Sequence, residues 1–141
     1  MIKIGKGLLA SRVNAYTNEG DAAKTAFHKE GKAFLRALAS EIGLVPGTFD
    51  VRSNLGGVAV SGEVTLHADT LYVQLSESCV SPGISVMYRT CKGRKDYTGG
   101  SNNFVSMQNL QLATRQEEFI RSCRLMAKTY ILVDDRMRKA A

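Results

Sequence analysis

VAVSGEVTLHADTLYVQL, residues 58–75, is the stretch that decides the fold class. Its first part, 58–66, and its last part, 70–75, are rich in β-branched residues, and 67–69 provides turn chemistry between them. Short β-branched runs joined by tight turns are typical of antiparallel strands. Gly62 stands inside the first run, where glycine commonly marks a bulge or a close approach of two backbones. The stretch therefore predicts two paired strands.

Two further runs extend this pattern outward. Residues 48–52 alternate before the central stretch, and residues 84–91 alternate after a turn at 82–83. Alternation with a period of two places one set of side chains on each face of a sheet. We therefore predict an antiparallel sheet of about four strands.

Helical patterns lie on both sides of the sheet region. Apolar residues recur at helical spacing over 21–42, with Asp21 as a candidate N-cap. Gly31 costs this helix about 1 kcal/mol relative to Ala, and it marks either a close contact or a break into two helices. Thr114 and Glu117 have the spacing of a capping box at the start of a second helix. Its apolar stripe consists of Phe119, Cys123, Met126 and Tyr130.

The composition bounds the class of protein. The chain has 141 residues, of which 44% are hydrophobic, and its formal net charge is +6. This length and composition predict one globular domain, residues 1–141, of the α+β class, with the sheet flanked by an N-terminal and a C-terminal helix. No apolar run approaches the roughly 20 residues of a membrane-spanning helix, so we expect a cytoplasmic protein with no membrane contact.

The cysteines and histidines favour neither a disulfide framework nor a metal centre. Three widely spaced cysteines contain no Cys-x-x-Cys pair, so we expect free thiols, with Cys123 in the core. The two histidines are His28 and His67. His67 and Asp69 form the only local acid–base pair, and a histidine in a turn is more often incidental than catalytic. We therefore expect no metal, no cofactor and no enzymatic activity.

Chemistry-bearing side chains concentrate in residues 89–103, RTCKGRKDYTGGSNN. Four cations fall within seven residues, and three glycines permit positive φ, so that successive N–H groups can converge on an anion. Guanidinium groups bind phosphate in a bidentate manner, an aromatic ring stacks on a base, and amide side chains read a base edge or a ribose. The candidate ligand-binding residues are Arg89, Lys92, Arg94, Lys95, Tyr97, Thr98, Gly99, Gly100, Asn102, Asn103 and, from a second loop, Arg52.

Other interpretations of these segments remain open. The segment 89–103 contains neither a P-loop nor a dinucleotide fingerprint, and a solvent-exposed basic hairpin would account for the same residues. The second loop, 52–57, also combines a cation with two glycines, and it needs no function as a turn. If the two loops lie at the same end of the sheet, they form one pocket. A basic stripe on the second helix is either a solvated face or a phosphate wall, and it consists of Arg121, Arg124 and Lys128.

The run 88–103, which contains GRKDYTGGSNN, and the upstream run 56–67 resemble a motif of small tailed-bacteriophage proteins. The two runs cover roughly the middle of the chain. The resemblance implies an analogy to phage anti-defence proteins that sequester nucleotide immune signals, such as the Thoeris anti-defence proteins. A homo-oligomer in the host cytoplasm would fit this class.

Three functions follow as hypotheses. The first is a non-catalytic binding protein for a nucleotide or a related phosphorylated signal, with an anti-defence role. The second is a phage inhibitor that binds a host defence protein, similar to an anti-CRISPR protein. The third is direct binding of DNA or RNA, which the basic charge permits without specifying.

Overall fold

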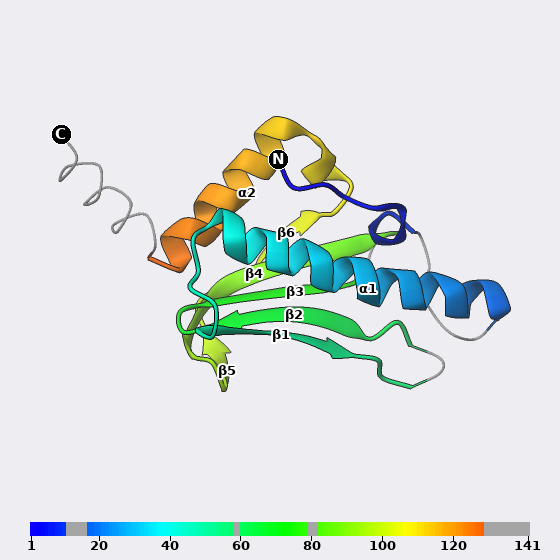
Figure 1. The fold of residues 1–141 in the computed structure, drawn as a ribbon, viewed down its shortest axis with the longest axis horizontal. Helices are drawn as coiled ribbons and strands as arrows, with labels where there is room; N and C mark the ends of the chain where they lie inside the picture. The colour runs from blue at the N-terminus through cyan, green and yellow to red at the C-terminus, as the bar shows by residue number, and fades with distance from the viewer. Residues whose placement is uncertain (11–16, 58–59, 79–81, 129–141) are drawn as a thin grey trace.

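The computed structural model describes residues 1–10, 17–57, 60–78 and 82–128 (Figure 1). Its elements in chain order are η1 (Lys6–Leu8), α1 (Asn18–Glu41), β1 (Phe49–Asn54), β2 (Glu63–Ala68), β3 (Leu71–Glu77), β4 (Ile84–Gly93), β5 (Asp96–Gly99), β6 (Asn103–Ser106), η2 (Asn109–Gln111) and α2 (Ala113–Met126). This confirms the α+β prediction. The expectations for Cys79 and Tyr130 lie outside the described residues. None of the described helices has the length and apolarity required to cross a membrane.

The sheet has six antiparallel strands, where the sequence predicted about four. The order is β1-β2-β3-β4-β5, and β6 also pairs with β4. β4 is long enough to bond to both: its first half pairs with β6, and its end pairs with β5. Because β3 occupies the other edge of β4, β5 and β6 follow one another along the same edge. The segment predicted as a loop is therefore mostly strand.

Helix α1 crosses the sheet as one continuous element. It starts earlier than predicted, because Thr17 rather than Asp21 is the N-cap, and its Oγ1 accepts a hydrogen bond from the N–H of Gly20. Gly31 does not break the helix. A Cβ at this position would lie 3.0 Å from a methyl group of Val64 on β2, so the glycine permits a close approach of helix and sheet.

The start of α2 differs from the prediction of a capping box. Its N-cap is Leu112, which donates no side-chain cap, and Thr114 already lies in the first turn. The 3-10 turn η2 ends one residue before Leu112, so it leads directly into α2. No side-chain hydrogen bond caps the start of this helix. One turn later, the buried amide of Gln116 accepts from the N–H of Ile2 and donates to its carbonyl oxygen. The N-terminal residues are thereby fixed against α2.

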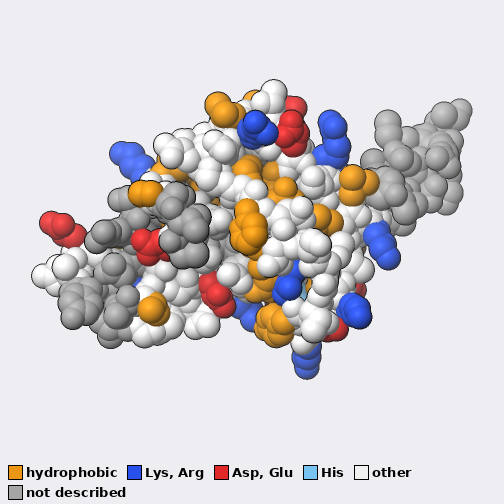
Figure 2. All heavy atoms as spheres, turned by 180° about the vertical axis from the view of Figure 1, so that it is seen from behind, with side chains coloured by type: hydrophobic (Ala, Val, Ile, Leu, Met, Phe, Trp, Pro, Cys, Tyr) orange, Lys and Arg blue, Asp and Glu red, His pale blue; other side chains and the backbone are white. Residues whose placement is uncertain are grey.

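Both helices lie on the same face of the sheet (Figure 1). The ring of Phe119 on α2 contacts the ring of Tyr88 on β4, with centroids 5.1 Å apart. The core fills the space between helices and sheet and includes Cys123, as predicted, with no exposed surface. Figure 2 shows the molecule turned by 180° from the view of Figure 1, so that the face of the sheet opposite the helices is toward the viewer. This second face is called the open face below.

Candidate functional site

A row of four side chains crosses the open face on four neighbouring strands. Asp50 on β1 pairs in register with His67 on β2, and His67 pairs with Tyr72 on β3. Tyr72 in turn pairs with Arg89 on β4. Its phenol has a pKa raised to about 12, mainly because burial disfavours the phenolate. The guanidinium of Arg89 lies 5.0 Å from the centre of the Tyr72 ring, in a cation–π contact.

Tyr97 on β5 folds back over this row. Its ring centroid lies 5.1 Å from that of His67 and 5.9 Å from that of Tyr72, in tilted and edge-on contacts. Its hydroxyl accepts a hydrogen bond of 3.2 Å from Arg52, and its carbonyl oxygen accepts one from Arg89. Tyr97 nevertheless remains 57% exposed. Arg52 thus holds the side chain of Tyr97 and Arg89 its backbone, and the residue still presents surface to solvent.

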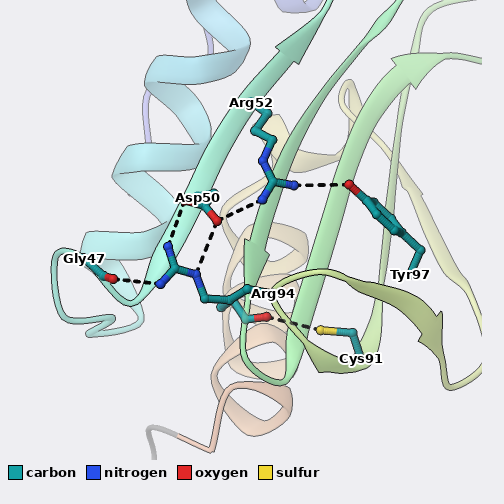
Figure 3. A network of polar contacts seen from close by, with 7 residues as sticks. Gly47, Asp50, Arg52, Cys91, Arg94 and Tyr97 are labelled. Atoms are coloured by element: carbon teal, nitrogen blue, oxygen red, sulfur yellow. Dashed lines mark hydrogen bonds and ion pairs between the residues drawn. The ribbon is translucent and has the colours of Figure 1, made fainter.

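Arg94 connects the turn between β4 and β5 to β1 (Figure 3). Its Nη2 lies 2.8 Å from a carboxylate oxygen of Asp50, and its Nη1 donates to the carbonyl oxygen of Gly47 at 2.9 Å. The same carboxylate accepts a hydrogen bond of 2.9 Å from Arg52. These hydrogen bonds, that from Arg94 foremost, hold the pKa of Asp50 below its ordinary value. Arg94 was predicted as a phosphate ligand. In the structure its guanidinium donates instead to Asp50 and to the carbonyl oxygen of Gly47.

His67 lies beneath Tyr97 with no exposed surface, and neither ring nitrogen has a hydrogen-bond partner among the described residues. The turn predicted at 67–69 is shorter, because β2 continues through Ala68. This places His67 inside the sheet, where it packs against the rings of Tyr72 and Tyr97. An imidazole in this position supports both aromatic rings, which also contact each other.

The glycines of β5 do not form the predicted anion cradle. Positive φ was expected at Gly93, Gly99 and Gly100, and none of the three adopts it. A Cβ at Gly99 would lie 1.9 Å from the carbonyl oxygen of Thr90, so this glycine permits the close pairing of β5 with β4. Convergent N–H groups from left-handed glycines are therefore not available here.

Two polar side chains of the segment stabilise the hairpin itself. The hydroxyl and the N–H of Thr98 both donate to the carboxylate of Asp96, and the pKa of Asp96 is lowered by these bonds. The amide of Asn103 donates to the carbonyl oxygens of Tyr88 and Ser101. Asn102 is exposed between β5 and β6. Thr98 and Asn103 thus use their side chains within the protein, whereas no hydrogen bond of the Asn102 amide to another described residue is present.

Lys92 and Lys95 extend the site toward solvent. Both are exposed, and neither makes a hydrogen bond or an ion pair to another described residue. The end of the sheet that carries β5 holds three more cations, Arg52, Arg89 and Arg94. In Figure 2, blue side chains gather at this end of the molecule. A polyanion approaching here meets ammonium groups that no carboxylate neutralises by direct contact.

The second predicted loop does not reach this site, apart from Arg52. The chain from Gly56 to Gly62 connects the opposite ends of β1 and β2 (Figure 1). There Lys24 donates to the carbonyl oxygen of Gly57, and His28 bridges Ser53 and the carbonyl oxygen of Ser61, which fixes the loop to α1. Burial lowers the pKa of His28 and favours its neutral form. The loop contributes stability rather than ligand contacts.

The basic stripe of α2 also lies elsewhere. α2 packs on the helical face of the sheet, and Arg124 donates to the carbonyl oxygen of Glu41 at the end of α1. Arg121 and Lys128 are exposed on the same helix or just beyond it. The stripe therefore does not line the open face.

Sequence reasoning missed three residues of the site, Asp50, His67 and Tyr72. The available signal was register: with β2 extended to Ala68, the alternation of β1 to β4 places all three on the face of Arg89. Comparison with protein-family models, curated proteins and solved structures found no match. The functional argument consequently rests on the site itself.

Proposed function

We propose that this protein binds a nucleotide or a related phosphorylated ligand without catalysing a reaction, and that the ligand lies on the open face over Tyr97. One observation carries the proposal: the ring of Tyr97 packs against His67 and Tyr72, Arg52 bonds its hydroxyl, Arg89 bonds its backbone carbonyl, and the residue still remains 57% exposed. Stacking of a base on an aromatic side chain contributes about 1–3 kcal/mol. The fixed ring loses little freedom on binding, which favours affinity.

The phosphate would be held by the ammonium groups at the edge of the same face. Neither Lys92 nor Lys95 forms an ion pair with a described carboxylate, although the charge of Lys92 helps to lower the pKa of Asp96. A phosphate therefore does not have to displace an existing ion pair. Arg89 has a buried Nε without a hydrogen-bond partner among the described residues, and its guanidinium faces Tyr72. We assign Arg94 a positioning role, because it already bonds Asp50 and Gly47.

The biological role that fits this site is sequestration of a nucleotide signal by a phage anti-defence protein in the host cytoplasm. Its support is the resemblance of the GRKDYTGGSNN run to tailed-bacteriophage proteins, together with the basic charge. A homo-oligomer would place several such sites in one particle. Binding to a host defence protein is the competing role, and the same experiment separates the two.

Native mass spectrometry of the purified chain with linear and cyclic nucleotides tests the proposal. We expect a bound nucleotide in the unmodified protein and its loss in Tyr97→Ala, which removes the stacking ring. Tyr97→Phe keeps the ring and loses only the hydroxyl contact with Arg52, so it serves as the matched control and should retain the ligand. A folded protein that binds no member of the panel would contradict the proposal and favour a host-protein target.

A further inference from the structure

Phe104 on β6 is a second aromatic ring on the open face that the proposed nucleotide site does not use. It is 67% exposed, more than Tyr97. The next residue, Val105, turns toward the core, so the alternation of β6 points Phe104 to the other face. Its exposed ring therefore offers a second aromatic surface on this face, in addition to that of Tyr97.

The sheet register connects the two rings. Phe104 pairs with Met87 on β4, and the same row continues through Gln74, Thr65 and Arg52 to β1. This row runs directly beside the row that Tyr97 covers, which is two residues away along each strand. From strand spacings of about 4.8 Å and a rise of about 3.4 Å per residue, Phe104 lies about 12 Å from Tyr72 on the open face. The ring of Tyr97 contacts both Tyr72 and His67, and His67 lies one strand farther from β6, so one base cannot stack on both Tyr97 and Phe104.

The surface between the rings suits the edges and sugars of a polynucleotide. Gln74 and Met87 are half-buried and uncharged, and Thr65 beyond them is buried, so no carboxylate of this row opposes a phosphate chain. The Gln74 side-chain oxygen accepts a hydrogen bond of 2.9 Å from the hydroxyl of Tyr72, which leaves its amide N–H groups for a base. The cations lie at one end of this strip, beside Tyr97.

We infer that the open face binds single-stranded nucleic acid, with one base on Tyr97, a following base on Phe104, and the backbone near Lys92 and Lys95. The inference rests on the proposed nucleotide site and extends it from one nucleotide to a strand. Proteins hold unpaired bases by stacking them on aromatic side chains, with cations that contact the backbone. A duplex does not fit, because its bases stack on each other and do not expose their faces to the sheet.

Competition binding by fluorescence anisotropy tests the inference. A labelled oligothymidylate is displaced by unlabelled thymidine monophosphate, by short oligothymidylates of increasing length, by oligouridylates and by the annealed duplex. We expect affinity to rise from the monophosphate to the oligomers and to fall on annealing. The oligouridylate arm decides between DNA and RNA as the preferred strand.

Phe104→Ala supplies the decisive variant. It should weaken oligomer binding by about tenfold, or about 1.4 kcal/mol, and leave monophosphate binding unchanged. Leu112→Ala is the matched control, because Leu112 is 57% exposed and lies at the start of α2, away from the open face.

Two outcomes would overturn the inference and are distinguishable. If the monophosphate binds as tightly as the oligomers and Phe104→Ala leaves oligomer affinity unchanged, binding of a nucleic-acid strand is excluded. The proposed nucleotide site is then retained. If neither nucleotide nor oligomer binds a folded protein, both proposals fail. An oligomer that requires both Tyr97 and Phe104 supports the inference even where the monophosphate is too weak to detect.

Discussion

Arg94, in the turn between β4 and β5, lies with its Nη2 2.8 Å from a carboxylate oxygen of Asp50 on β1. The two residues are separated by 44 positions in the sequence. Since β5 carries Tyr97, this contact fixes the end of the hairpin from which the ring projects. The position of Tyr97 and the geometry of β1 are therefore coupled through this ion pair, as they are through the bonds of Arg52 to Asp50 and Tyr97.

The two possible roles of Arg94 predict opposite effects of replacing Asp50. If Arg94 positions the hairpin, Asp50→Ala should weaken nucleotide binding by roughly as much as Arg94→Ala, and the double variant should be no worse than either, as expected for two groups that act through one interaction. If Arg94 binds phosphate directly, removing its carboxylate partner should tighten binding. Isothermal titration calorimetry on the three variants measures the difference. We expect the first outcome.

Salt dependence should reveal the contribution of the exposed lysines. We expect the double variant Lys92→Ala/Lys95→Ala to bind oligonucleotides more weakly and to show a shallower dependence of affinity on salt. Each lost phosphate contact lowers the slope of log affinity against log salt by about 0.7 for a single strand. The double variant Arg36→Ala/Arg121→Ala removes the same charge from exposed helix positions and controls for net charge. An equal change of slope in both would contradict a local phosphate site.

Gly62 should be required for folding of the loop between β1 and β2. It has a φ of +72°, and a Cβ there would lie 2.1 Å from the carbonyl oxygen of Asn54. We expect Gly62→Ala to lower the free energy of unfolding by about 1–3 kcal/mol, measured by urea denaturation, because a strained backbone conformation costs this much. At Gly57 an added Cβ meets nothing within 4 Å. Gly57→Ala should therefore leave the midpoint nearly unchanged, and equal effects would refute the steric account.

The bridge made by His28 should give the stability a pH dependence. Burial lowers the pKa of His28 below its ordinary value of 6.5, so the unfolded chain binds a proton at a pH where the folded chain does not. The free energy of unfolding should consequently fall as the pH drops from about 7.5 to about 5.5, through the ordinary histidine pKa. We expect His28→Gln, which cannot titrate, to reduce this fall. The urea midpoint of each protein is measured at the two pH values. An equal decline in the unmodified protein and in His28→Gln would show that His28 does not cause the pH dependence.

The sequence predicted the layers of the fold better than the edges of the sheet. The runs predicted as strands at 58–66 and 70–75 and the helical stripe at 21–42 are strong periodic signals. The structure contains β2, β3 and α1 there, but β2 begins only at Glu63 and continues to Ala68. β5 and β6 have four residues each and stand beside glycines, so their local pattern is that of a loop. Pairing with β4 makes them strands, and that information is not local.

The candidate site divides in the same way. Tyr97, Arg89, Arg52 and the two lysines were recognisable from residue chemistry alone. The burial of His67 was not, because one residue of strand extension moves a side chain from a turn into the sheet. The engagement of Arg94 by Asp50 also depends on the position of β1 beside the hairpin, which spacing along the chain does not specify.

The central claim is that ligand lies on the open face over Tyr97, and NMR chemical-shift mapping with a short oligothymidylate tests it most directly. The account predicts perturbed amides along β2, β3 and β4 and in β5, centred on His67, Tyr72, Arg89 and Tyr97, with the amides of α1 unchanged. Saturating ligand that perturbs only amides of α1 and of the N-terminal residues, or perturbs no amide, would contradict it.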